Sequence, residues 1–194
     1  MREDRQSPLH SLNARALLPG GPGTRPLAIE PGAPAVLAMT DFRTAPVVTT
    51  SFDTTIDQAL AQMKLSGARF AFVTGADHGL AGSVTSYDIQ GEKPMQYMLS
   101  VGCSETTCAW RDVQVENIME PVQDWQVIEF GRVERMTIAQ VASLLEEAGR
   151  RYLVVVEPAA AGGAVQVRGL FSAARLQMLA GSGMARAAEE ALAA

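Results

Sequence analysis

The sequence predicts an α/β (α+β) fold: two similar βαββα units packed about a pseudo-twofold axis, with a flexible N-terminal arm. The first observation is a repeat at a spacing of 82 residues, seen in three pairs: Thr55 and Thr137, Gly67 and Gly149, Arg69 and Arg151. The second is that the spacing becomes 87 residues between Gly82 and Gly169. The change falls in a Pro/Ala/Gly turn at 158–164, where insertions are tolerated. A repeat whose spacing changes only at a loop indicates an internal duplication.

The elements of the first unit follow from its periodicity and its turn residues. Residues 47–50, 69–74 and 80–85 are predicted strands, because they are short runs of apolar and β-branched residues, and a turn at 75–79 separates the last two. A helix is predicted from Thr55 to Gly67, since the threonine hydroxyl can cap it and apolar residues recur at helical spacing. A second helix is predicted to begin near Ser86.

The second unit repeats this order. A strand is predicted within 122–130, and Thr137 with Gln140 forms a capping box for a helix that ends at Gly149. Strands are predicted at 151–156 and 165–172, followed by a closing helix at 173–180. Each unit leaves one sheet face bare, so we expect the two units to pack on each other and to form two related clefts between them.

The predicted organisation has five parts. They are a flexible arm at 1–35, a first unit at 36–92, a linker at 93–112, a second unit at 113–181 and a C-terminal tail at 182–194. The linker is longer than a simple connection needs. Its methionine-containing segment 93–99 suits either an adaptable partner-binding helix or a contact with the core or with a dimer partner.

Bulk composition narrows the class of protein. A net charge of −5 and a pI near 5.1 give no reason to expect a nucleic-acid partner. No apolar run reaches the roughly 18–20 residues of a membrane span, and the polar N-terminus does not resemble a signal peptide. We therefore expect a cytoplasmic protein, and the Arg-, Ala- and Gly-rich composition is typical of GC-rich bacterial genomes.

The sequence does not indicate an enzyme or a metal site. The two histidines, His10 and His78, lie in the arm and in a turn, and no P-loop or G-x-G-x-x-G pattern is present. Cys103 and Cys108 are predicted to be reduced thiols, with a local disulfide or redox-sensitive linker as the alternative. Two cysteines without nearby histidines do not complete a zinc site.

The pattern G-x-x-T-x-x-D at 82–88 is the most informative segment. It places Thr85 where a strand meets a helix, with Asp88 three residues later. One interpretation is purely structural, because T-x-x-D at such a junction is a capping box. The other is functional: a helix N-terminus attracts anions, and the aspartate can accept two hydrogen bonds from a ribose diol. The pattern alone leaves both interpretations open.

Together, these features resemble a tandem pair of CBS domains, named after cystathionine β-synthase and often called a Bateman module. The resemblance rests on the duplicated βαββα order, on Met39-Thr40 and Asn117-Ile118-Met119 before the units, and on the pattern at 82–88. It covers about residues 36–180. Such modules usually bind adenosine-containing ligands between the paired domains and often form dimers. The resemblance implies a regulatory ligand rather than an obligatory cofactor.

The resemblance also implies which residues line the first cleft. One wall would carry Ser83, Thr85, Tyr87 and Asp88, which hold the ribose in the family. The other wall would carry Val127, Ile128, Arg150, Arg151 and Tyr152, which contact base and phosphates. Adjacent guanidinium groups suit phosphate oxygens, although Arg150 and Arg151 can equally form a solvated corner.

The second cleft departs from the family pattern, because Arg175 stands where the ribose carboxylate is expected. Arginine has no acceptor, so it cannot bind a diol. The residues implied for this degenerate site are Val48, Thr49, Ala68, Arg69, Phe70, Ser172 and Arg175. We expect this cleft to be empty or to take a phosphate-rich ligand, and we expect one nucleotide per chain.

The predicted function is a stand-alone regulatory module. It would bind AMP, ADP, ATP or S-adenosylmethionine, form a homodimer and signal to a partner protein, with no catalytic residues and no metal. The alternative is a structural dimerisation or adaptor module that kept the fold and lost the ligand.

Overall fold

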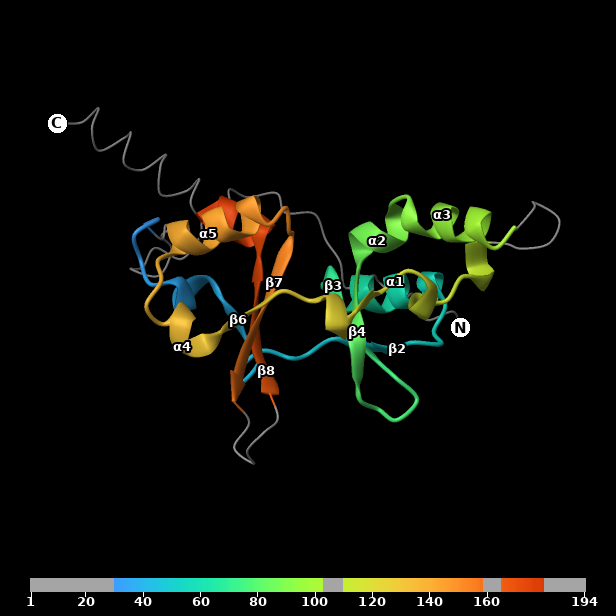
Figure 1. The fold of residues 1–194 in the computed structure, drawn as a ribbon, viewed down its shortest axis with the longest axis horizontal. Coiled ribbons are helices and arrows are strands. Elements are labelled where there is room, and N and C mark those ends of the chain that lie inside the picture. Colours follow the sequence, from blue (N-terminus) through green and yellow to red (C-terminus); the bar gives the residue numbers. More distant parts are fainter. Residues whose placement is uncertain (1–29, 103–109, 159–164, 180–194) are drawn as a thin grey trace, which may run out of the picture.

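Two four-stranded sheets form the body of the molecule in the computed structural model, which describes residues 30–102, 110–158 and 165–179 (Figure 1). The first sheet has the order β2 (Thr49–Ser51), β3 (Phe70–Thr74), β4 (Leu80–Thr85), β5 (Glu120–Pro121). The second has the order β1 (Thr40–Asp41), β8 (Val165–Ser172), β7 (Tyr152–Pro158), β6 (Val127–Glu129). In both sheets one pair is parallel, β2 with β3 and β6 with β7, and the other pairs are antiparallel. This shared topology confirms the predicted fold of two like units.

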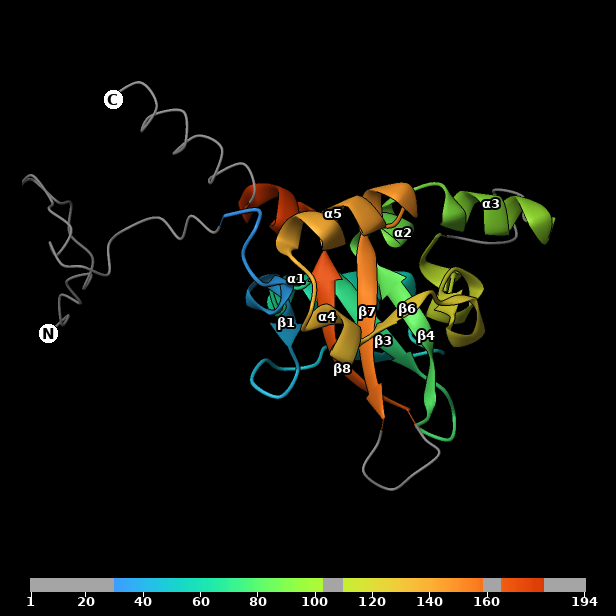
Figure 2. The same ribbon diagram turned by 60° about the vertical axis from the view of Figure 1, so that its left-hand side comes forward.

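Helices cover the outer faces of the sheets. The α-helices are α1 (Ile56–Leu65), α2 (Ser86–Gln90), α3 (Lys93–Ser100), α4 (Phe130–Val133) and α5 (Ile138–Glu147), and residues 173–179 are also helical. Short 3-10 turns are η1 (Ala35–Ala38), η2 (Trp110–Asp112), η3 (Val115–Asn117) and η4 (Val122–Asp124). Figures 1 and 2 show α3 extending away from the second sheet. None of the described helices combines the length and apolarity that crossing a membrane requires.

The matching helices α1 and α5 begin and end as predicted. Thr55 Oγ1 accepts a hydrogen bond from Gln58 N at 3.4 Å, and Thr137 Oγ1 accepts one from Gln140 N at 3.3 Å. These bonds satisfy backbone N–H groups that the first helical turn leaves free. Each helix is followed by a glycine at positive φ, Gly67 at 63° and Gly149 at 61°, a conformation that L side chains rarely adopt.

The central strands alternate between two apolar surroundings, because successive side chains of a strand point to opposite faces of the sheet. One set packs under the helices of its own unit: Ala71 and Val73 on β3, and Leu153 and Val155 on β7. The other set meets between the sheets: Phe70, Phe72, Val154 and Val156, together with Leu170 of β8. The two units therefore bury their bare sheet faces against each other, as predicted.

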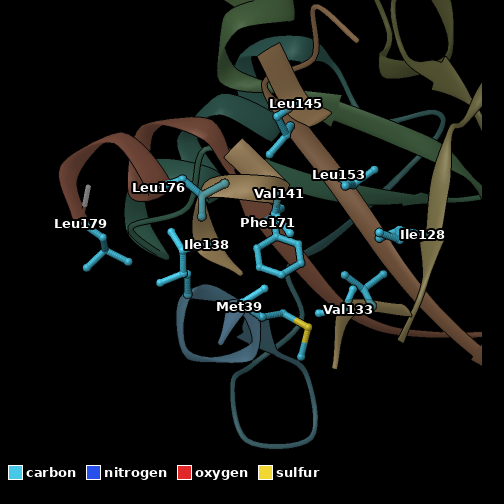
Figure 3. Close-up of a cluster of buried hydrophobic side chains, with 13 residues drawn as sticks. Met39, Ile128, Val133, Ile138, Val141, Leu145, Leu153, Phe171, Leu176 and Leu179 are labelled. Atoms are coloured by element: carbon cyan, nitrogen blue, oxygen red, sulfur yellow. The ribbon is translucent and has the colours of Figure 1, made fainter. Parts of the chain in front are cut away.

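The segment that leads into each unit packs against the other unit. β1 pairs with β8 of the second sheet, and β5 pairs with β4 of the first. The buried residues of these segments are Ala35, Ala38 and Met39 in the second unit's core, and Val113, Val115 and Ile118 in the first unit's core. Figure 3 shows Met39 among Phe171, Val133 and Ile138. The two units thus exchange their leading segments and are joined in both directions.

The prediction of a flexible arm up to residue 35 is wrong at its C-terminal end. Residues 31–35 are attached to the start of α5, and Ala35 is fully buried. Ala33 O accepts a hydrogen bond from Ile138 N at 3.0 Å, and Pro31 O accepts one from Ala139 N at 2.9 Å. The first turn of α5 has free N–H groups, and backbone carbonyls of any sequence can satisfy them. Such an attachment leaves no pattern in the sequence, because it uses backbone atoms. Residues 1–29 lie outside the described part of the chain.

The start of β2 and the predicted domain boundaries also differ from the contacts in the structure. β2 begins at Thr49 rather than at residue 47, although Val48 O still accepts a hydrogen bond from Phe72 N at 3.0 Å. The predicted domain boundaries remain predictions, but packing between the units crosses them, because 113–121 belongs by contact to the first unit.

A buried arginine holds β1 to the second sheet. Arg168 on β8 is 7% exposed and forms ion pairs with Asp41 of β1 and, at 3.4 Å, with Glu157 of β7. Its guanidinium also lies 4.7 Å from the centroid of the Phe130 ring. Ala81 occupies the equivalent position in the first unit, so this ion-pair network belongs to the second unit alone.

The exchanged strands explain two glycines, and one of them provides a test. A Cβ at Gly82 would collide with the carbonyl oxygen of Glu120 on β5, and a Cβ at Gly169 would collide with that of Thr40 on β1. Since the obstacle is backbone, we expect Gly82→Ala to lower the free energy of unfolding by about 1–3 kcal/mol.

Urea denaturation measures this change, with Gly131→Ala on α4 as the control. A Cβ at Gly131 meets nothing within 4 Å, so this change should be neutral or stabilising by about 0.5–1 kcal/mol. Equal stability of Gly82→Ala and the unchanged protein would contradict the close approach of β5.

Candidate functional site

A cavity of about 220 Å³ opens between the two units, and we call it the first cleft. One wall comes from β3, β4 and the start of α2, and the other comes from residues 120–126 and 149–154. Its lining residues are Phe70, Ser83, Thr85, Asp88, Glu120, Trp125, Gln126, Gly149, Arg150, Arg151, Tyr152 and Val154. The cleft therefore combines hydroxyl, carboxylate, guanidinium and aromatic groups.

The hydroxyl and carboxylate groups lie where β4 ends and α2 begins. Thr85 Oγ1 accepts a hydrogen bond from Asp88 N at 3.1 Å and donates one to Asp88 Oδ2 at 2.6 Å. The same Oδ2 accepts a hydrogen bond from Thr85 N at 2.8 Å. This is the capping box that the T-x-x-D pattern predicts. The cap uses Oδ2 only, which leaves Oδ1 of Asp88 for another partner.

That other partner is Lys93, the first residue of α3. Its Nζ lies 2.7 Å from Asp88 Oδ1 and also donates a hydrogen bond to Ile118 O at 3.3 Å. The Lys93 side chain is 45% exposed, and solvent-exposed ion pairs contribute little to stability. A ligand hydroxyl can therefore compete with Lys93 for Oδ1, and Lys93 connects the cleft to α3.

Arg150 on the opposite wall is paired within the cleft. Its Nη1 forms an ion pair with the carboxylate of Glu120, and its Nη2 donates a hydrogen bond to Asp124 O at 3.4 Å. Both side chains of the ion pair are about one-third exposed. Glu120 belongs to β5, directly opposite Ser83 on β4. An acidic group thus stands between the ribose-type wall and one of the two arginines.

Arg151 lies at the border of the first cleft. Its guanidinium carbon is 4.2 Å from the centroid of the Tyr87 ring, and Tyr87 Oη accepts a hydrogen bond from Arg69 Nη1 at 3.1 Å. These three residues, with Tyr152 and Ser172, also line a neighbouring cavity of about 260 Å³. Stacking of a guanidinium on an aromatic face is favourable, so Arg151 is held by Tyr87, and it has no carboxylate partner among the residues that the structure describes.

Aromatic rings complete the first cleft. Phe70 and Tyr152 have ring centroids 5.1 Å apart, and Trp125 lies 5.8 Å from Phe72. Trp125 Nε1 also donates a hydrogen bond to Glu120 O at 3.3 Å. The tryptophan and β5 thereby fix each other, and the cleft gains flat apolar surfaces of the kind on which a base stacks.

The pseudo-twofold counterpart of the first cleft is occupied by apolar side chains. Leu170 stands in place of Ser83, and Phe72 stands in place of Val154, and both are buried between the sheets. Phe42 packs edge-to-face on Phe72, with centroids 5.5 Å apart. Of the polar wall of the first cleft, Ser83 is replaced by apolar Leu170 and Asp88 by Arg175, while Ser172 is the counterpart of Thr85.

The residues predicted for the second cleft are distributed among several of the described cavities and surfaces. Arg69 and Ser172 line the 260 Å³ cavity, Ala68 and Arg69 line another of about 420 Å³, and Phe70 lines the first cleft. Val48 packs against the first unit's core, whereas Thr49 and Arg175 are exposed. The arginine at position 175 does not by itself reveal the apolar packing of Leu170 and Phe72.

Most residues predicted for the first cleft do lie together. The structure collects Ser83, Thr85, Asp88, Arg150, Arg151 and Tyr152 around one cavity. It places Tyr87 in the neighbouring cavities and buries Ile128 in the second unit's core, while Val127 does not line the first cleft. The chain reaches the cleft two residues earlier than predicted, at Trp125 and Gln126.

The sequence analysis missed several lining residues: Glu120, Trp125, Gln126, Gly149 and Val154, with Phe70 assigned to the other cleft. The exchange of leading segments places Glu120 here, and no local pattern signals that exchange. Among the residues that the structure describes, no group of three or more His, Cys, Asp and Glu side chains could hold a metal ion. Cys103 and Cys108 lie outside the described residues, so their redox role remains a prediction.

Tyr152 provides a pH-dependent test of the cleft. Burial raises the pKa of its phenol above 10.0, and the nearby Tyr87 phenol raises that pKa further, against the lowering effect of Arg69 and Arg151. A folded-state pKa above the unfolded value gives stability that is complete below about pH 10 and lost as pH rises through the folded pKa. We expect Tyr152→Phe to reduce this alkaline loss of stability.

Urea denaturation at neutral pH and at about pH 9.5 to 11.5 measures the difference. Tyr97→Phe, on α3 and outside the cleft, is the control. The same alkaline loss in Tyr152→Phe and in the unchanged protein would show that the phenol is not buried as described.

Comparisons with known proteins agree with this architecture. The sequence profile of the CBS domain matches residues 39–92, and no curated protein matches the chain significantly. A solved structure of an uncharacterized conserved protein from Pyrococcus horikoshii superposes with a TM-score of 0.51 at 16% identity, covering 77% of this chain and 93% of that one.

Two further similar structures are of the protein CBSX2. The CBS-pair protein CBSX2 from Arabidopsis thaliana has 21% identity, coverage of 84% of this chain and 99% of that one, and a TM-score of 0.46. CBSX2 in complex with AMP has 20% identity, coverage of 77% and 96%, and a TM-score of 0.47.

The first unit of this chain matches the CBS domain in sequence, and the second repeats its strand order and helix caps. Residues 39–92 are therefore similar to a CBS domain, and the chain has the fold of two such units.

Proposed function

We propose that this chain is a regulatory module, not an enzyme, whose first cleft binds an adenosine-containing ligand and signals to a partner protein. The observation that carries the proposal is the juxtaposition of Asp88 and Thr85 on one wall with Trp125, Arg150 and Arg151 on the other. Each group suits a different part of such a ligand.

The ribose suits the wall formed by β4 and α2. A ribose diol donates two hydrogen bonds, and an ionised carboxylate accepts them. Asp88 keeps Oδ2 in the cap while Oδ1 faces only an exposed ammonium, so a diol can bind at Oδ1 without breaking the cap. The hydroxyls of Ser83 and Thr85 border the same wall.

The base and the phosphate suit the opposite wall. Base–aromatic stacking contributes about 1–3 kcal/mol per base, and Phe70, Trp125 and Tyr152 provide rings in the cleft. Arg151 has no carboxylate partner among the contacts described and lines the cleft, where its guanidinium can meet a phosphate.

Apolar packing at the second cleft supports one ligand per chain. Leu170 and Phe72 replace the polar residue and the smaller side chain that shape the first cleft. Burying these side chains stabilises the interface between the sheets, so opening a second site would sacrifice part of that interface.

Titration calorimetry against AMP, ADP, ATP and S-adenosylmethionine tests the proposal. A free ligand concentration of 100 times Kd should raise the free energy of unfolding by about 2.7 kcal/mol. We expect Asp88→Asn to weaken binding roughly 10- to 100-fold, because charge-assisted hydrogen bonds contribute about 1.5–3 kcal/mol.

Gln140→Ala is the control, since it weakens a capping box of the same kind on α5 that does not line the cleft, and it should leave the affinity unchanged. If the unchanged protein binds none of these ligands at millimolar concentration, the alternative of a ligand-free dimerisation or adaptor module replaces this proposal.

A second experiment tests the route of the signal. We propose that ribose hydroxyls displace Lys93 from Asp88 Oδ1 and so loosen α3. Hydrogen exchange should then show that ligand lowers amide protection in α3 of the unchanged protein. In Lys93→Met, protection of α3 should be low already and should not respond to ligand.

Lys64→Met on α1 serves as the control, because Lys64 is exposed and does not line the first cleft. Ligand binding with unaltered exchange in α3 would rule out this route.

A further inference from the structure

The first cleft contains an acidic group that the repeated scaffold does not require. β5 pairs with β4 so that Glu120 lies opposite Ser83, and β1 pairs with β8 so that Thr40 lies opposite Leu170. Thr40 and Glu120 are therefore equivalent strand positions, and an uncharged residue fulfils the strand's role in the second unit. The carboxylate of Glu120 is thus free to serve the cleft.

The backbone that carries the Glu120 carboxylate is fixed in position beside the cleft. The carbonyl oxygen of Glu120 accepts a hydrogen bond from Trp125 Nε1 at 3.3 Å, and its backbone passes so close to Gly82 that a Cβ there would collide with it. The backbone of β5 is held from both sides. The side chain is then placed beside Arg150, with which it forms an ion pair.

The ion pair changes the charge that a ligand meets. Among the residues that line the first cleft, Asp88 and Glu120 oppose Arg150 and Arg151, so the two signs balance. Arg150 is committed to Glu120, which leaves Arg151 as the lining cation without a carboxylate partner among the contacts described. One guanidinium can compensate one phosphate group, but a longer phosphate chain would approach the Glu120 carboxylate.

We propose that the Glu120–Arg150 ion pair selects adenosine ligands that carry one phosphate group or none, and discriminates against di- and triphosphates. A polyphosphate can reach Arg150 only by displacing Glu120, which leaves a half-buried carboxylate unpaired beside further negative charge. The cleft volume of about 220 Å³ points the same way, because it is below the roughly 300–1,000 Å³ of typical ligand pockets. The inference rests on the proposed function of the first cleft.

The test compares the Kd values of adenosine, AMP and ATP, measured by titration calorimetry without divalent cations. The unchanged protein should bind AMP at least about 10-fold more tightly than ATP. Glu120→Gln keeps the shape of the side chain and removes its charge, so ATP affinity should rise about 10-fold or more while AMP affinity changes less than about 3-fold.

Asp124→Asn is the matched control. Asp124 is an exposed acid close to Glu120 in sequence, and its side chain does not line the cleft, so this change should leave the AMP-to-ATP ratio unaltered. If Glu120→Gln and Asp124→Asn raise ATP affinity equally, the cause is the net charge of the protein, and selection by the ion pair is overturned.

The outcomes separate the two proposals. Binding of ATP as tightly as AMP, or an unchanged ratio in Glu120→Gln, overturns the selection while the proposed function stands. Absence of binding for all three ligands overturns the proposed function and the selection with it. The ratio in the unchanged protein needs no variant, so equal binding of ATP and AMP overturns the selection even if Glu120→Gln does not fold.

Discussion

The packing of the two bare sheet faces against each other is the interaction on which the rest of this structure depends. Phe70 and Phe72 of one sheet meet Val154 and Val156 of the other, and burial of side chains of this size contributes about 1.5–3 kcal/mol each. A mixed sheet covered by helices on one side is stable only if its other side is also buried. The exchange of leading segments adds strand pairing to this contact, so neither unit completes its core without the other.

The cleft lies where this apolar contact stops. In the first unit, Ser83, Thr85 and Asp88 interrupt it with polar groups, and their hydrogen bonds form a helix cap that exists without any ligand. At the equivalent place in the second unit, Leu170 continues the apolar contact. The duplicated scaffold thus carries polar groups at one border and an apolar contact at the other. The ion pair of buried Arg168 with Asp41 joins β1 to β8 in the second unit, where the first unit has Ala81 at the equivalent position.

The charged groups of the cleft already have partners in the absence of a ligand. Asp88 faces Lys93, Arg150 faces Glu120, and Arg151 stacks on Tyr87. These contacts hold the side chains in place, which lowers the entropic cost of ordering them around a ligand. They also mean that binding exchanges one contact for another. Such an exchange favours specificity over raw affinity.

The sequence by itself determined the elements of the fold and much of the polar wall. The 82-residue repeat, the Thr55 and Thr137 caps and the strand at 80–85 depend on local periodicity and hydrogen bonding, which are legible along the chain. Only the tertiary structure placed Glu120 and Trp125 in the cleft, moved Tyr87 out of it and occupied the second cleft with Leu170 and Phe72. The physical reason is that strand exchange and packing between the sheets join residues far apart in sequence, and neither leaves a periodic signal.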